Sequence, residues 1–177
     1  MKVSLIIVST LFSLQSFSQK INRILFTDAN AGFSVNLNDE WKQDDTKDRT
    51  SAFFTSNKKN CIITVRLTKV PKNTILIYTK DEAASIKPEL ISMFKARNVS
   101  VSKLSVFPSK FSGFECMTSI AYIKDPQLNN GKELYYKTIQ LLHKNNLFNI
   151  IYSIPISIIN NNEILSIEKE LQTIRFF

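Results

Sequence analysis

The sequence predicts an α+β fold in which an antiparallel β-sheet meander packs with two helices. Two features support this fold class: short segments that alternate apolar and polar residues between turn signals, and two capped segments with helical spacing. The chain has 177 residues, of which 44% are hydrophobic and 21% are charged. That composition favours a single domain with a buried core and argues against a disordered chain.

The first residues have the order of a secretory signal peptide. Lys2 supplies the positive charge, Val3–Leu14 is apolar, and Gln15–Gln19 is small and polar. The apolar run is shorter than the roughly 20 residues of a membrane span, although a retained anchor is the alternative. No cysteine lies nearby to carry a lipid, so the chain is not expected to be a lipoprotein. We expect cleavage after Ser18, export to the periplasm or the exterior, and one domain over residues 19–177 without a transmembrane segment.

Three strands are expected in the first third of the mature chain. Phe33–Leu37 alternates and predicts the first strand, and Ser51–Ser56 and Cys61–Val70 predict two more. The segment Asn57–Asn60 has the composition of a hairpin loop joining the last two. Alternation in the third strand places its apolar residues on one face, which we expect to be buried: Cys61, Ile63, Val65 and Leu67.

A first helix is expected after these strands. Thr79 and Glu82 fit a capping box, in which each side chain satisfies a free backbone N–H. Pro88 should kink this helix or split it after Lys87. Apolar residues recur at helical spacing: Ala83, Ile86, Leu90 and Phe94.

A strand meander and a second helix complete the chain. The alternation of apolar and polar residues in the first meander strand shifts near Lys103, which predicts a bulge. The helix spans Asn160–Ile174, with an Asn cap and Glu163 in its first turn, and Arg175–Phe177 can dock as a short last strand. The meander is predicted from four alternating segments with turns at Asn130–Gly131 and Asn145–Asn146: Asn98–Phe107, Phe111–Ile123, Lys132–Lys144 and Leu147–Pro155.

The chain resembles the PsbP-like superfamily, which includes Mog-type and DcrB-like proteins. The resemblance rests on the stretch Gly32-Phe33-Ser34-Val35, followed by Leu37 and Trp41, and on the closing Arg175–Phe177. Asn38 stands where members of the superfamily usually have proline. The resemblance covers Ile24–Phe177 and implies a sandwich of sheet and helices. It also implies a role in assembly or binding, without catalysis.

Trp41 is the only tryptophan, and we expect it to be structural, together with Gly32 and Phe33. A tryptophan just past a strand can fold back to close one end of a core while its N–H stays near a partner. The alternative is a tryptophan that stacks on a ligand in an open groove.

Residues with catalytic or metal-binding chemistry are few, so we expect no cofactor, metal site or catalytic residue. Three glycines cannot form a phosphate-binding loop. His143 is the only histidine and has no orienting partner nearby in the sequence. The acidic residues cluster between Asp39 and Asp48, where Ca²⁺ binding is the alternative to a solvated loop of mixed charge.

Cys61 and Cys116 are the only cysteines, and both lie on apolar strand faces. An exported compartment permits a disulfide between them. Two separate buried thiols are the alternative, because free cysteine packs as a small hydrophobic residue.

The net charge is +8, but basic residues are scattered among acidic ones, so we expect no nucleic-acid partner. The favoured function is an exported, non-catalytic binding or assembly module of the cell envelope, with a protein or envelope component as its partner. The alternatives are a carrier that holds a small apolar ligand between sheet and helices, and a hydrolase. The loops expected to bind are Asn38–Thr50, Lys69–Asn73 and Lys124–Gly131.

Overall fold

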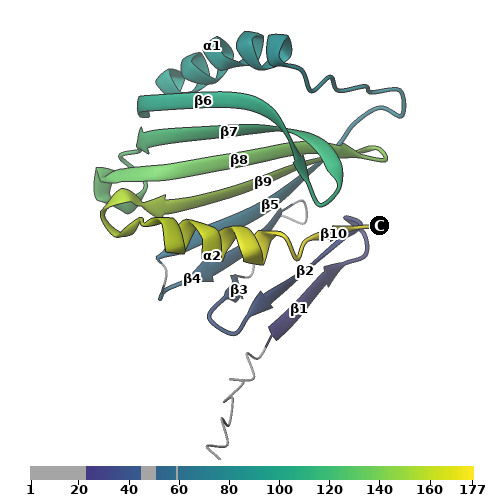
Figure 1. The fold of residues 1–177 in the computed structure, drawn as a ribbon, viewed down its shortest axis with the longest axis horizontal. Helices are drawn as coiled ribbons and strands as arrows, with labels where there is room; N and C mark the ends of the chain where they lie inside the picture. Colours follow the sequence, from purple (N-terminus) through teal and green to yellow (C-terminus); the bar gives the residue numbers. More distant parts are fainter. Residues whose placement is uncertain (1–22, 45–50, 59) are drawn as a thin grey trace, which may run out of the picture.

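The computed structural model describes residues 23–44, 51–58 and 60–177. The predicted signal peptide and its cleavage site lie outside these residues, as does part of the acidic loop. The α+β fold class is confirmed: two helices pack on antiparallel sheets (Figure 1).

Seven strands form one antiparallel sheet in the order β3-β4-β5-β9-β8-β7-β6. The last four strands of the sheet follow the chain as the predicted meander, and β5 extends it by pairing with β9. The bounds are β3 (Lys42–Asp44), β4 (Ser51–Ser56), β5 (Cys61–Lys69), β6 (Ser100–Phe111), β7 (Phe114–Lys124), β8 (Glu133–His143) and β9 (Asn146–Pro155).

The meander differs from the prediction in its turns. The predicted strand Phe111–Ile123 is divided at Ser112–Gly113, where both residues have positive φ and join β6 to β7. The last turn is Lys144–Asn145, one residue earlier than predicted, with Lys144 at a φ of 53°. The predicted bulge is confirmed between Val101 and Lys103. A 3₁₀ turn, Asn129–Gly131, occupies the loop between β7 and β8.

A small sheet joins the two ends of the described chain in the order β1-β2-β10. Its strands are β1 (Arg23–Asp28), β2 (Phe33–Asn38) and β10 (Arg175–Phe176), and they lie together in Figure 1. Gly32 makes this closure possible. Its φ is +76°, its carbonyl accepts from the Phe177 N–H at 3.0 Å, and an added Cβ would lie 2.9 Å from the Phe177 oxygen. Only glycine fits that conformation and that close approach.

The first helix, α1 (Lys80–Ala96), is capped as predicted: the Thr79 hydroxyl accepts from the Glu82 N–H at 3.2 Å. The helix continues through Pro88, so of the two predicted outcomes the split is wrong, and the kink stays a prediction. Pro88 lies on the exposed side of the helix, where the carbonyl that loses its hydrogen bond can be solvated. Two α1 residues are buried, Ala83 and Phe94.

The second helix, α2 (Asn161–Leu171), follows a 3₁₀ turn at Ile156–Ile158. The Asn160 side chain accepts from the Glu163 N–H at 2.9 Å, which confirms the predicted cap. The helix ends three residues before the predicted end. Its residues Ile167 and Leu171 are fully buried.

The large sheet has two differently covered faces. The face that we call the inner face carries the alternate residues of β9, all fully buried: Phe148, Ile150, Tyr152 and Ile154. α2 and the small sheet cover it, and together they form the main core. The other face, which we call the outer face, carries a second and smaller core beneath α1, built from Phe94, Val99, Leu104, Ala121, Ile123 and Leu134. In Figure 1, α2 lies across the sheet, whereas α1 follows its β6 edge.

Candidate functional site

A cleft with a volume of about 210 Å³ lies between α1 and the outer face. Glu82 and Ile86 of α1 form one wall, and four residues of the loop that joins β5 to α1 form the other, Ile75–Tyr78. Met117 of β7 and Gln140 of β8 also line it. We call this the α1 cleft.

The wall formed by Ile75–Tyr78 alternates between exposed and half-buried side chains. Ile75 is 82% exposed and Ile77 is 61% exposed, whereas Leu76 and Tyr78 are half-buried. The Tyr78 hydroxyl anchors the loop because it accepts from the Leu142 N–H at 2.9 Å. Burial raises the pKa of this phenol, so it stays protonated at neutral pH.

A narrower pocket of about 70 Å³ continues the α1 cleft along the helix. It shares Ile86, Met117 and Gln140 with the cleft and adds Leu90 of α1. The Gln140 side chain is fixed by a hydrogen bond of 3.0 Å from its Nε2 to the Asn149 Oδ1. The remaining lining residues come from β6, β7 and β8: Val106, Ser119 and Thr138.

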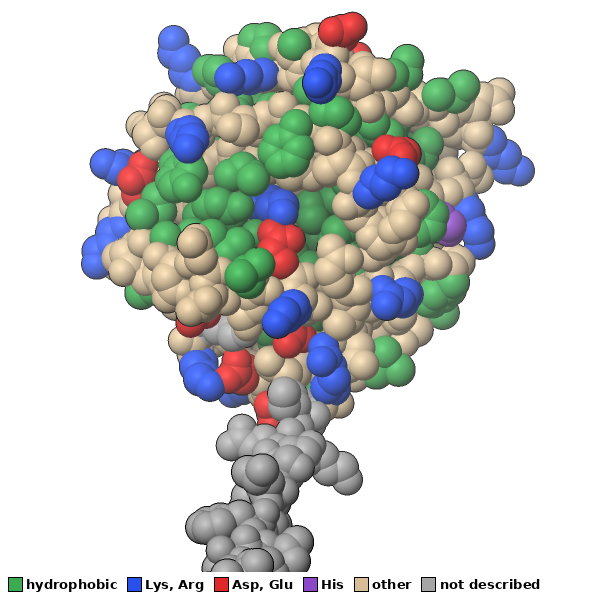
Figure 2. Space-filling model, in the orientation of Figure 1, with side chains coloured by type: hydrophobic (Ala, Val, Ile, Leu, Met, Phe, Trp, Pro, Cys, Tyr) green, Lys and Arg blue, Asp and Glu red, His purple; other side chains and the backbone are tan. Residues whose placement is uncertain are grey.

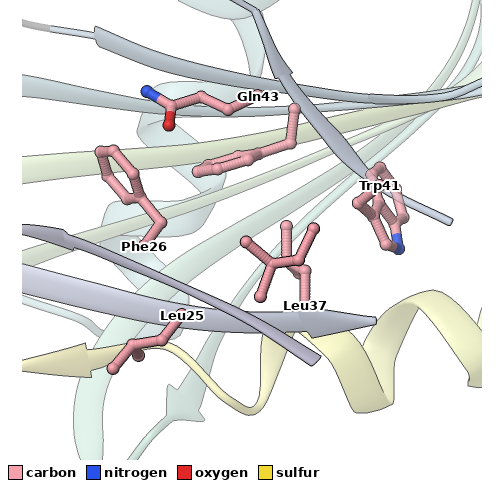
Figure 3. Close-up of a pocket in the computed structure, with 7 residues that line it drawn as sticks. Leu25, Phe26, Leu37, Trp41 and Gln43 are labelled. Carbon is pink, nitrogen blue, oxygen red and sulfur yellow. The ribbon is translucent and has the colours of Figure 1, made fainter. Parts of the chain in front are cut away.

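Trp41 lies beside a second pocket of about 70 Å³, between the small sheet and the β3–β4 edge (Figure 3). Phe26 of β1, Leu37 of β2 and Gln43 of β3 converge on it. Trp41 is 2% exposed, which favours the packing role over ligand stacking. Its ring nitrogen points away from the other lining residues and is buried without a hydrogen-bond partner in the described chain, contrary to the expectation of a nearby partner.

The other two residues expected to be structural have clear packing roles. Phe33 is 2% exposed and lies 5.7 Å from Phe26 and 6.1 Å from Phe148 between ring centroids. It joins the small sheet to the inner face. Gly32 closes the small sheet, as described above.

His143 does not form a catalytic arrangement with the residues that the structure describes. Its ring packs edge-on against Phe114, with centroids 4.9 Å apart, and lies 6.1 Å from Phe176. Its Nε2 is buried and has no hydrogen-bond partner among these residues. Burial, and to a lesser extent Lys144, lowers the pKa of this imidazole.

The possible disulfide is not formed, because Cys61 and Cys116 are both free and buried. They lie on β5 and β7, and two other strands separate β5 from β7 in the sheet. Three strand spacings amount to about 14 Å, whereas a disulfide needs Cα atoms within roughly 7 Å. The alternative of two separate buried thiols is therefore correct.

The acidic residues between Asp39 and Asp48 do not converge where the structure describes them. Glu40 pairs with Lys58, and Asp44 accepts weakly from the Thr55 hydroxyl at 3.4 Å. Asp45 and Asp48 lie outside the described residues. Within the described ranges no group of three potential ligands could hold a metal ion.

Sequence reasoning missed a half-buried polar cluster between α2 and the inner face. Glu168 of α2 accepts from the Tyr152 hydroxyl at 2.6 Å and from the Lys137 ammonium at 2.5 Å. Burial and the Glu168 charge raise the pKa of Tyr152, so this phenol acts as a hydrogen-bond donor and not as a base. No local pattern could show this cluster, because its members come from three separate elements.

The charged side chains are scattered over the face of the molecule that Figure 2 shows. On the face shown in Figure 2, Lys and Arg lie among Asp and Glu and do not gather in one basic stripe. Neither described helix has the length and apolar character needed to span a membrane.

The comparison with solved structures decides the fold. The structure matches that of cyanobacterial PsbP from a Synechocystis species, with a TM-score of 0.61 and 10% identity. The match covers 89% of this chain and 94% of the PsbP chain. The chain has the PsbP-like fold. This fold also matches a Bacteroides thetaiotaomicron protein, with a TM-score of 0.58, 17% identity and coverage of 88% and 48% of the two chains. A variant of the protein Mog1 matches with a TM-score of 0.53, 9% identity and coverage of 88% and 96%.

The sequence itself has no such match. No protein-family model matches it, and no curated protein is significantly similar. The PsbP-like fold is therefore visible in the spatial arrangement of strands and helices, whereas identities of 9–17% carry no information on function.

Proposed function

We propose that this chain is a non-catalytic binding module and that the α1 cleft is its binding site. The observation that carries the proposal is the contrast between this cleft and its border. The cleft has a volume of about 210 Å³, and two residues of its loop wall, Ile75 and Ile77, expose most of their apolar surface. Exposed apolar groups next to a preformed cleft are typical of interaction sites.

The two other functions have less support. A carrier needs a lined cavity of roughly 300–1,000 Å³, and the interface between α2 and the inner face is instead filled by fully buried side chains. A hydrolase needs a nucleophile and a base held by a third group. The His143 ring, packed between two phenylalanines, does not supply that base.

Photo-crosslinking tests the position of the binding site. A photoreactive residue placed at Ile77 should give a discrete crosslinked product in the cell-envelope fraction. The matched control is Leu165 of α2, which is 58% exposed and lies on the other side of the large sheet. Equal crosslinking from both positions would show that the α1 cleft is not the site. Turnover of an ester, peptide, phosphate or glycoside substrate that is lost in His143→Ala would contradict the non-catalytic function.

We also infer that the chain is exported and acts in the cell envelope. The inference rests on the order of Lys2, the apolar run Val3–Leu14 and the polar segment Gln15–Gln19. The intact mass of the protein from the envelope fraction should correspond to a chain that begins at Gln19. A membrane-bound protein that keeps residues 1–18 would contradict export with cleavage.

A further inference from the structure

The backbone of Ile75–Tyr78 makes no hydrogen bond within the described chain. The bonds nearest to it are those from the Thr74 N–H to the Pro71 oxygen and from the Ala83 N–H to the Thr79 oxygen. Four consecutive residues therefore keep their N–H and C=O groups available. Ile75 and Ile77 are among the most exposed apolar residues of the molecule, so these groups border solvent. An occupant of the α1 cleft binds most favourably if it forms hydrogen bonds with these N–H and C=O groups.

The side chains of this segment suit a strand. Its sequence, Ile-Leu-Ile-Tyr, consists of residues favoured in strands, apart from Leu76. Exposure alternates with a period of two, as in a strand with one covered face. The segment nevertheless belongs to neither sheet. It has the character of a sheet edge that is available for pairing.

The α1 cleft runs along the backbone edge of this segment. All four residues Ile75–Tyr78 line the cleft. Successive side chains of an extended segment point to opposite sides, so a cleft over one side would touch only alternate residues. Contact with all four places the cleft beside the unpaired N–H and C=O groups.

The opposite wall supplies side-chain selectivity. Ile86, Leu90 and Met117 surround the narrow continuation of the cleft, which fits one apolar side chain. Glu82 lies on the same wall, and its carboxylate forms no ion pair within the described chain. An occupant with a positive charge near its apolar anchor complements both features.

We propose that the α1 cleft binds an extended peptide of a partner protein, which pairs as an added strand with Ile75–Tyr78. This inference rests on the proposed function and specifies its partner. The peptide carries an apolar anchor residue and, two positions away, a lysine or arginine. The spacing of two residues follows because alternate residues of a strand face the same side. The apolar anchor and the basic residue of the peptide then both face the wall that carries the pocket and Glu82. Backbone pairing supplies affinity, and the pocket supplies specificity.

The two other possible occupants fit less well. A small apolar ligand cannot satisfy the backbone groups of Ile75–Tyr78. A second copy of the chain would bring together two basic molecules, because the net charge of +8 falls only to +7 when Lys2 is removed with the signal peptide, and this charge opposes close association.

The first experiment is a selection of phage-displayed random twelve-residue peptides on the wild-type protein. We expect enriched peptides with an apolar residue two positions from a lysine or arginine. Amide hydrogen exchange is then measured with the strongest synthetic peptide. In the free protein the amides of Ile75–Tyr78 should exchange rapidly, and the bound peptide should protect alternate ones. N-methylation of a pairing amide of the peptide should weaken binding by roughly twofold to tenfold, the value of one hydrogen bond.

The second experiment tests the charge. Glu82→Gln should weaken peptide binding by up to about fivefold, the range of an exposed ion pair. Glu89→Gln is the matched control, since Glu89 is also an exposed glutamate of α1 but does not line the cleft. Equal effects of the two substitutions would overturn the charge assignment.

The outcomes separate the two proposals. A peptide that binds in the cleft without protecting Ile75–Tyr78 overturns strand addition and leaves the binding module intact. A selection without enriched peptides, together with no crosslinks from Ile77, overturns both. Concentration-dependent dimerisation that protects the same amides would identify a second copy as the occupant and would also overturn the peptide.

Discussion

The two helices cover opposite faces of one sheet, and they do so very differently. α2 places Ile167 and Leu171 fully inside the main core and adds Glu168 and Glu170 as polar anchors. α1 is longer but buries only Ala83 and Phe94, and it leaves a cleft beside the outer face. The inner face is thus built for stability, whereas the outer face is loosely covered. A sheet that is stabilised from one side can leave the other side open for binding.

The largest expected effect comes from the end of the main core. Trp41→Ala should lower the free energy of unfolding by about 3–5 kcal/mol, the range for removing a large buried aromatic side chain. Urea denaturation followed by circular dichroism measures this change. The native tryptophan emission should be blue-shifted, and an emission maximum like that of free tryptophan would contradict its burial.

A pair of helix substitutions tests the comparison directly. Ile167→Ala on α2 should cost about 2–5 kcal/mol, because the side chain is fully buried. Ile86→Ala on α1 removes the same atoms from a half-buried position at the cleft, so we expect a clearly smaller loss. Equal losses in urea denaturation would show that the outer face contributes as much as the inner face.

Substitution of Glu170, a polar anchor of α2, should have an intermediate effect on stability. Glu170 is 7% exposed and accepts from the Asn38 N–H, the Asn38 amide and the Arg23 guanidinium. Glu170→Ala leaves these donors without their acceptor, so it should cost about 1–3 kcal/mol. Glu163→Ala is a control from the first turn of the same helix. A thermal melt in which both variants lose equal stability would contradict the anchoring role.

The smallest effect concerns pH. Burial lowers the pKa of His143 in the folded protein, so the unfolded chain binds a proton more readily. The full stability is therefore present above the unfolded pKa of about 6.5 and declines as the pH falls through the lower folded value. Stability measured in urea between pH 5.5 and 7.5 should show this decline, and His143→Phe should reduce it. An unchanged slope in that variant would assign the effect to other groups.

The sequence was sufficient for features that local patterns determine. The caps at Thr79 and Asn160 and the meander follow from neighbouring residues. The alternation in β5 holds in part, because Thr64 is also buried and Leu67 is only half-buried. The PsbP-like resemblance agrees with the fold found by structural comparison.

The missed features depend on distant parts of the chain. β1 was not predicted because its apolar Ile24 and Leu25 are exposed, and β3 because it is short and polar. Glu170 has the pattern of a surface helix residue and is buried only because β2 lies against α2. The α1 cleft combines residues of a loop, a helix and two strands. No single segment carries its signature.

The closure at Gly32 has a consequence for the order of folding. β2 pairs with β10, which follows it only after nearly the whole described chain, whereas each meander strand pairs with its neighbour in sequence. Long-range pairing carries a greater loss of chain entropy, so we expect the small sheet to form after the rate-limiting step. Phe176→Ala should then accelerate unfolding and leave the folding rate nearly unchanged in stopped-flow kinetics, and a slower folding rate would contradict this order. The meander can therefore assemble from strands that are neighbours in the sequence before the two ends of the described chain meet in the small sheet.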